Sequence, residues 1–423
     1  GKSRSARWLP TWNVSGAWNA HEEKFFSNLT SVLSHFTLKA SYSLTADRGP
    51  ADVTNSQAII TSYSPYRPFT SIQESGLYIK ELENSELTYE KKHELNIGAD
   101  MGFLNNRINL AVDWYKRNNY DLIGIVNTQG AGGQILKYAN IASMKSHGIE
   151  FTLSTKNIKT KDFNWNTDFI FSNAKNEVTD LKQNANVMEL ISGNGFAKQG
   201  YPVRGLFSIP FVGLDKDGIP VIINEKGEAT STDINFQERQ NTGFLKYEGP
   251  TDPTITGSLG NMFSYKGFRL NLFITYSFGN VIRLNPVFKA YYSDLTAMTR
   301  EFKNRWTLPG DEAKTNVPAI LSKRMYDSNE DLKYAYNAYN YSTERIAKGD
   351  FIRLKEISLA YDFPKAWINP LKLTDLSLKV QATNLFLIYA DDKLNGQDPE
   401  FFNAGGVASP VPRQFTITLR LGL

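Results

Sequence analysis

The feature of this 423-residue chain that most constrains its fold is an alternation of apolar and polar side chains with a period of two. In residues 36–45, for example, Phe36 and Leu38 alternate with Thr37 and Lys39. A period of two puts successive side chains on opposite faces of a β-strand, whereas the apolar side chains of an amphipathic helix repeat about every 3.6 residues. The helical period is almost absent. The alternating runs are residues 11–20, 36–45, 95–103, 108–114, 149–153, 163–171, 255–265, 268–278, 357–363, 376–382 and 415–423. The pattern predicts an all-β protein with about eleven strands.

The connections between these runs alternate between short and long. Four are short, at about 103–106, 157–162, 266–267 and 364–373, and a fifth at 21–35 is somewhat longer. The long connections lie at about 46–86, 119–146, 177–252, 280–349 and 390–412. An up-and-down antiparallel β-barrel in an outer membrane has short periplasmic turns and long extracellular loops, so this order predicts a transmembrane barrel. A soluble sandwich has no reason to put all its long loops at one end.

The two faces of the predicted strands differ in the way that a membrane barrel requires. Lys39, Asp113 and Glu150 lie on the polar face, where each would cost a few kcal/mol if it faced lipid, so that face is expected to line a wet interior. Aromatic side chains such as Trp12 and Phe268 lie near strand ends, as interfacial girdles do. No run of 18 apolar residues exists, which excludes a transmembrane helix, but a transmembrane strand needs only about ten alternating residues.

An odd number of strands indicates that the barrel is incomplete in this chain. Bacterial single-chain barrels have even strand numbers and no free edge. We therefore expect the strand at 11–20 to pair with a strand outside the chain, and residues 1–10 to belong to a cut extracellular loop. With short turns in the periplasm, the C-terminus is expected to be periplasmic.

Composition excludes several other classes of protein. The chain has no Cys, so it has no disulfide framework, thiolate metal site or Cys nucleophile. A net charge of +4 from 47 basic and 43 acidic residues does not favour nucleic acid as a partner. The nearest match to a calcium loop is Asp215-Lys216-Asp217-Gly218, but Ile219 occupies the position of a required oxygen ligand. No catalytic constellation is present, and we predict neither an enzyme nor a bound metal or cofactor.

Short motifs from residue 84 onward point to a family. They include Tyr89-Glu90, Asn96-Ile97-Gly98, Asn140-Ile141-Ala142-Ser143-Met144, Gly200-Tyr201-Pro202, Thr251-Asp252-Pro253, Phe351-Ile352-Arg353-Leu354-Lys355, Asn384-Leu385-Phe386, Asp398-Pro399-Glu400 and Pro412-Arg413-Gln414-Phe415-Thr416. In order and spacing they resemble the C-terminal half of SusC-type TonB-dependent outer-membrane transporters of the SusC/RagA family. Two positions depart from that pattern: Ser85 stands where proline is expected, and the chain ends in Leu423 rather than in an aromatic residue.

The resemblance implies a 22-stranded plugged barrel, of which the chain, residues 1–423, would form half. The plug and the segment that contacts TonB would lie in an N-terminal half that is absent from this chain. The family works with a SusD-type lipoprotein lid and imports oligomeric nutrients, glycans or peptides, with energy delivered by TonB. The resemblance also implies the outer membrane of a Gram-negative bacterium and a dimer of transporter–lid pairs.

Two groups of side chains are candidate contacts within such an assembly. Tyrosines crowd the long connections, and flat amphipathic rings suit both stacking on sugars and packing in a protein interface. The candidates for substrate or lid contact are Tyr63, Tyr66, Tyr78, Tyr291 and Tyr292. Apolar residues on the otherwise polar face are candidates for contact with the plug: Ile170, Met262, Phe273 and Leu385.

Three functional classes remain in consideration. Nutrient import through a plugged barrel is the leading interpretation. A soluble all-β carbohydrate-binding module is the alternative, and it has no need of alternating loop lengths. A barrel enzyme would need an acid–base pair or a nucleophile near a strand end, and the sequence contains neither.

Overall fold

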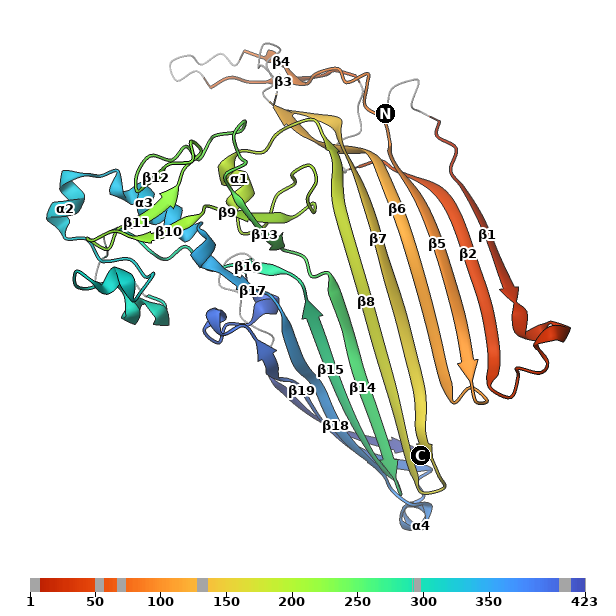
Figure 1. Cartoon of the computed structure of the whole chain (residues 1–423). Helices are drawn as coiled ribbons and strands as arrows, with labels where there is room; N and C mark the ends of the chain where they lie inside the picture. Colours follow the sequence, from red (N-terminus) through yellow and green to blue (C-terminus); the bar gives the residue numbers. More distant parts are fainter. Residues whose placement is uncertain are drawn as a thin grey trace.

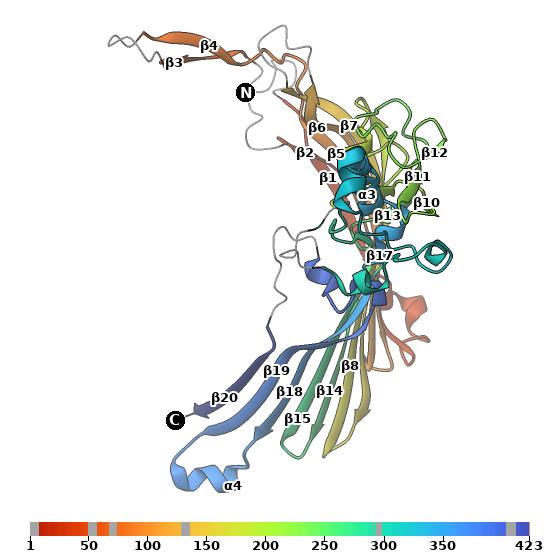
Figure 2. The same cartoon turned by 90° about the vertical axis from the view of Figure 1, so that its left-hand side faces the viewer.

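Eleven of the strands form one antiparallel sheet in which each strand pairs with the preceding strand of the sheet. The computed structural model describes residues 8–49, 57–66, 74–127, 136–290, 292, 298–402 and 412–422. In order the strands are β1 (Trp12–Asn19), β2 (Leu33–Asp47), β5 (Glu90–Phe103), β6 (Ile108–Asn127), β7 (Leu136–Lys159), β8 (Phe163–Leu181), β14 (Ile255–Tyr265), β15 (Phe268–Phe278), β18 (Phe351–Asp362), β19 (Asp375–Ala390) and β20 (Gln414–Gly422). Figures 1 and 2 show the sheet as a curved wall. The predicted all-β class and the eleven strands are confirmed.

The register keeps the two kinds of side chain on separate faces across the whole wall. Lys39, Gly98, Asp113 and Glu150 are direct partners on four successive strands, and they lie on what we call the polar face. The opposite, apolar face carries the alternate positions, and much of it is exposed in this chain: Ile417 is 74% exposed. Within the described residues, β1 and β20 each have a neighbour on one side only, so the sheet is an open arc.

The five short connections lie together at one end of the sheet (Figure 1). Leu104, Asn105 and Asn106 between β5 and β6 all have positive φ, and Lys266-Gly267 joins β14 to β15 with φ of 44° and 90°. Left-handed conformations at both central residues give the turn that matches the twist of a tight hairpin. Of the other three, the connection from β1 to β2 contains η2 (Ala20–Glu22) and η3 (Lys24–Phe26), and the one from β18 to β19 contains α4 (Lys365–Ile368) and η7 (Asn369–Leu371). Residues 160–162 alone join β7 to β8.

The long connections lie at the opposite end, and the strands extend further into them than the apolar pattern predicts. β6 and β7 stay paired as far as Asn127 and Leu136, so strand pairing occupies most of the range 119–146. These extensions lack the apolar alternation and are held by polar groups instead. The Asn140 carboxamide accepts from the Thr88 N–H and donates to the Asp121 carbonyl. A hairpin of β3 (Ile59–Tyr63) and β4 (Gly76–Glu81) projects from the first long connection (Figure 2).

The hydrophobic core lies in the long connections after β8 and β15. The first contains α1 (Val187–Ile191), β9 (Gly205–Ser208), β10 (Phe211–Leu214), β11 (Pro220–Ile223), β12 (Ala229–Thr230) and β13 (Lys246–Pro250). The second contains β16 (Val281–Arg283), η4 (Arg300–Asn304), η5 (Asp311–Ala313), α2 (Lys323–Ser328), α3 (Leu332–Asn340), η6 (Thr343–Arg345) and β17 (Ile346–Lys348), and η8 (Asp392–Leu394) and η9 (Pro399–Phe401) follow β19. One buried cluster surrounds Ile191 and Phe207, and another surrounds Phe288 and Tyr336. In the described part of the chain, no helix has both the length and the apolar character to span a membrane.

Candidate functional site

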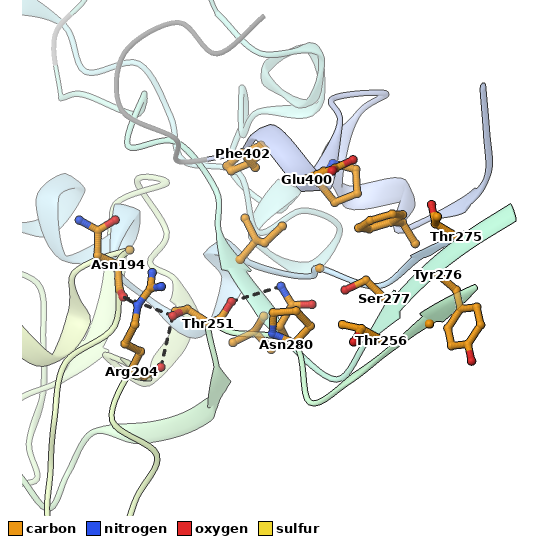
Figure 3. Close-up of a pocket in the computed structure, with 18 of the residues that line it drawn as sticks. Asn194, Arg204, Thr251, Thr256, Thr275, Tyr276, Ser277, Asn280, Glu400 and Phe402 are labelled. Carbon is orange, nitrogen blue, oxygen red and sulfur yellow. Dashed lines mark hydrogen bonds between the residues drawn. The ribbon is translucent and has the colours of Figure 1, made fainter. Parts of the chain in front are cut away.

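A cavity of about 520 Å³ lies where the sheet meets the long connections. The upper ends of β14, β15 and β18 form one wall, and loop residues near positions 193–204, 251–253 and 399–402 form the others (Figure 3). Its polar lining residues are Asn194, Arg204, Thr251, Thr256, Thr275, Ser277, Asn280, Lys355 and Glu400. Its apolar lining includes Val281, Ile282, Phe351 and Phe402. The mixture of hydroxyl, amide and charged groups with a few rings is typical of a site for a polar ligand.

The loop wall is held in place by its own hydrogen bonds. Arg204 forms an ion pair with Asp252, with Nη1 2.6 Å from the carboxylate, and its Nε donates to the Asn194 carbonyl at 3.0 Å. The Thr251 hydroxyl lies 3.2 Å from the same carbonyl (Figure 3). These contacts join two loop segments almost 50 residues apart, so this wall is preorganised.

The wall at the sheet presents polar side-chain groups that have no hydrogen-bond partner within the described residues. Asn280 donates from Nδ2 to the Thr251 carbonyl at 3.4 Å, but its Oδ1 is buried without a hydrogen-bond partner. Asn280 also packs so closely on Gly349 that a Cβ there would lie 2.1 Å from Nδ2. Thr256 and Ser277 are register partners whose hydroxyls point from the polar face. This wall therefore leaves hydrogen-bonding capacity for a ligand.

A buried ion triad fixes the third wall. Arg353 on β18 contacts Asp398 at 2.6 Å and Glu400 at 3.2 Å, and the side chains of Arg353 and Asp398 are only 6% and 10% exposed. Asp398 also caps η9 by accepting from the Glu400 N–H. Through these contacts the segment that carries Glu400 and Phe402 is held against the sheet (Figure 3).

A second buried arginine ties the two large connections together. Arg283 on β16 donates to the Phe207 carbonyl at 2.6 Å, to the Ser208 hydroxyl and to the Ser342 carbonyl. Burial lowers the pKa of Arg283 to about 9, and the nearby Glu248 carboxylate opposes that change. At neutral pH the guanidinium remains charged, and its hydrogen bonds join the connection after β8 to the connection after β15. We call these two connections together the loop module.

The described tyrosines among those singled out from the sequence do not line this cavity. Tyr63 and Tyr78 pack edge to face on the β3–β4 hairpin with ring centroids 5.5 Å apart, and Tyr66 is 89% exposed. Tyr292 packs on Phe302 at 5.2 Å, and its hydroxyl accepts from a backbone N–H. Tyr291 lies outside the described residues. Their contacts with substrate or lid stay predictions.

The proposed plug contacts do share the polar face. Ile170 is the register partner of Ser258, Met262 of Asn271, and Phe273 of Gly260. Ile170 and Met262 are 46% and 41% exposed, so they form an accessible apolar area among polar neighbours. Leu385 lies beside a bulge in β19 and lines a second cavity with Arg353. Contact with a plug stays a prediction for all four residues.

The Asp215 turn is a structural feature. Its carboxylate accepts from the N–H groups of Asp217 and Ile219, both at 2.9 Å. Among the described residues, no group of three His, Cys, Asp or Glu side chains is placed to hold a metal ion.

Sequence reasoning missed the cavity, although its key residues stand in two motifs that it noted. Arg353 and Lys355 belong to the motif at 351–355, and Asp398 and Glu400 belong to the motif at 398–400. Nothing in the sequence connects segments 45 residues apart. The one local signal is Arg353, a charged residue between the apolar residues Ile352 and Leu354.

Comparison with known proteins shows which proteins this chain resembles. No family model matches it. It is 25% identical over 404 residues to the TonB-dependent receptor P3 of Formosa agariphila, a match covering 91% of this chain and 37% of that protein. It is 26% identical over 448 residues to the TonB-dependent receptor SusC of Bacteroides thetaiotaomicron, covering 100% of this chain and 40% of that protein. The predicted resemblance to SusC-type TonB-dependent receptors is confirmed, and the chain spans about two fifths of the length of these relatives.

A solved structure shows the same fold. The RagAB peptide transporter superposes with a TM-score of 0.77 at 23% identity, and the match covers 99% of this chain and 44% of that one. The open eleven-stranded arc therefore has the fold of a little under half of that solved chain.

Proposed function

We propose that this chain is part of an outer-membrane β-barrel that imports an oligomeric nutrient, a glycan or an oligopeptide, in a TonB-dependent manner. The observation that carries the proposal is the sheet itself. It has one exposed apolar face for lipid, one polar face for a wet lumen, and all its long connections at one end. The names of its relatives, TonB-dependent receptors and a peptide transporter, support the same class.

In this proposal the cavity binds part of the substrate at the outer mouth of the barrel. The long connections are extracellular and the C-terminus is periplasmic. An N-terminal half of the barrel pairs with the free edges of β1 and β20 and carries the plug. A SusD-type lipoprotein lid covers the mouth, and force from TonB displaces the plug. Two such transporter–lid pairs form the dimer.

We do not propose an enzyme. The curated relatives are named as receptors, and the cavity combines hydroxyls, amides and paired charges without a nucleophile–base arrangement among the described residues. A soluble carbohydrate-binding module is disfavoured because Phe415, Ile417 and Leu419 remain exposed on the apolar face. Lipid would shield such a face, whereas in a soluble protein the face would stay in unfavourable contact with water.

The topology can be tested in cells because the chain has no cysteine of its own. In the full-length transporter, a cysteine at Lys333 in a long connection should react with a membrane-impermeant maleimide on intact cells. A cysteine at Lys161 in a short turn should react only after the outer membrane is permeabilised. Both positions are exposed, so they form a matched pair. The reverse pattern would contradict the orientation, and labelling of both in a soluble fraction would contradict the membrane location.

Transport itself requires an uptake measurement. Cells that carry the transporter should take up fluorescent oligosaccharides or oligopeptides, and deletion of the transporter or of TonB should abolish that uptake. Uptake that persists without TonB would refute the proposed energy source.

A further inference from the structure

We propose that the mouth cavity binds a carboxylate group of the imported oligomer and that the Lys355 ammonium is the cation that receives it. This inference rests on the proposed transport function and narrows its substrate class to oligomers that carry a carboxylate. The carboxylate can belong to a uronic acid sugar or to a peptide, and the two sources share the same binding chemistry.

The charges that line the cavity are paired, with one exception. Arg204 contacts Asp252 at 2.6 Å, and Glu400 contacts Arg353 at 3.2 Å. Within the described residues, Lys355 has neither an ion-pair partner nor a side-chain hydrogen bond. An ammonium that lines a cavity in this way attracts an anionic ligand.

The backbone at Lys355 is irregular in a way that sets this side chain apart. Against β15, the register passes from Leu354 to Glu356, and Lys355 has no partner. The pairing with β19 shifts between the same two residues. Lys355 is thus an extra residue relative to β15, and it has no register partner on β19, where two unpaired residues, Asn384 and Leu385, lie opposite it. Bulges of this kind re-aim a side chain and are over-represented beside functional sites.

Neighbouring groups fit the rest of a carboxylate-bearing unit. The buried Oδ1 of Asn280 lacks a donor, and the hydroxyls of Thr256, Thr275 and Ser277 make no side-chain hydrogen bond within the described residues. Sugar hydroxyls or peptide N–H groups beside the carboxylate can donate to Asn280. An oligomer that supplies both an anion and donors satisfies this wall, whereas a neutral one leaves Lys355 unpaired.

The test measures binding to the purified full-length transporter in detergent by isothermal titration calorimetry. The probes are trigalacturonate against maltotriose, and tetra-alanine with a free C-terminus against the same peptide amidated. We expect at least one carboxylate probe to bind about tenfold more tightly than its neutral counterpart, as one charged hydrogen bond in a partly exposed site allows. The pair that shows the preference identifies the source of the carboxylate.

Variants assign the preference to the lysine. Lys355→Met should remove about tenfold of the affinity for the carboxylate probe and leave the neutral probe unchanged, and Lys355→Arg should retain most of it. Lys348→Met is the matched control: it removes an exposed charge on β17 that does not line the cavity, and it should have no effect. Lys355→Gln serves as a second variant if the methionine variant fails to fold.

Several results would overturn the inference. These are equal binding of carboxylate and neutral probes, no binding of either carboxylate probe, or unchanged binding in Lys355→Met. A Lys355→Met variant that loses thermal stability without losing affinity would show that the ammonium pairs with another part of the transporter. None of these results touches the proposed import, which fails only if TonB-dependent uptake or the labelled topology fails.

Discussion

The ion triad of Arg353, Asp398 and Glu400 makes a quantitative prediction about the mouth of the barrel. In Asp398→Asn the carboxamide oxygen can still accept the Glu400 N–H, because asparagine is as good a cap as aspartate. The substitution therefore removes the charge and leaves the cap in place. Arg353 then depends on Glu400, which is 40% exposed.

The size of the effect follows from burial. Removing one partner of a buried ion pair costs about 3–5 kcal/mol, and the remaining contact with Glu400 puts this case near the lower limit, about 3 kcal/mol. At about 1.4 kcal/mol per factor of ten, local opening of the segment 391–402 should become about a hundredfold more frequent. The sheet should not be affected, since its strands are paired independently of this segment.

Hydrogen exchange followed by mass spectrometry measures this opening in the full-length transporter. The reporting amides are those of Leu394, Gln397 and Phe401, which are hydrogen-bonded within the segment. Asp375→Asn is the control, because its ion pair with Lys365 is mostly exposed and such pairs contribute about 0–1 kcal/mol. If exchange in 391–402 is unchanged in Asp398→Asn, or changes as much in the control, the triad does not hold the segment.

Three further predictions concern the wall of the barrel. Gly257→Ala should impair barrel assembly, because a Cβ there would lie 2.1 Å from the Ile170 carbonyl oxygen, whereas a Cβ at the control position Gly260 meets only ordinary contacts. Heat-modified migration on gels measures assembly, and equal behaviour of the two alanine variants would contradict the packing. Ile417→Lys on the apolar face should destabilise the folded barrel in lipid by about 2–4 kcal/mol, and Thr416→Lys on the polar face should destabilise it far less. Urea titrations in vesicles measure both free energies of unfolding, and equal losses would refute the assignment of faces. Met262→Cys should react with a thiol reagent much faster once the plug is deleted from the full-length protein, and an unchanged rate would exclude plug contact there.

The barrel wall could be predicted from sequence because one rule governs every strand. In residues 268–278 successive side chains face lipid and water in turn, so the position of each residue in the strand determines whether it is apolar or polar. The rule ends where the strands leave the apolar band. Around Asn119 consecutive residues are polar, and Asn140 stands between Ala139 and Ile141, so no alternation marks the paired extensions of β6 and β7 in the sequence.

The loop module escaped prediction for a different physical reason. Its buried residues, such as Ile191, Phe207 and Tyr336, come from short elements that are too brief to show a period. Tyr336 and Tyr339 are two of the tyrosines in the long connections, and packing buries both, which raises the pKa of each hydroxyl. Burial of a loop aromatic depends on partners far away in the chain, and no local pattern records them.

The position of the cavity follows from how these two parts are stabilised. The loop module has its own buried core, whereas the sheet has almost none and depends on lipid and on further strands at its free edges. Arg353 and Lys355 stand two residues apart on β18, where the two parts join. Arg353 forms the ion pair with Asp398 that holds the loops, and at the bulge Lys355 has no register partner on either neighbouring strand. The same strand thus anchors the long connections and presents a cation to the cavity, so a substitution that disturbs the bulge should alter ligand preference without detaching these connections.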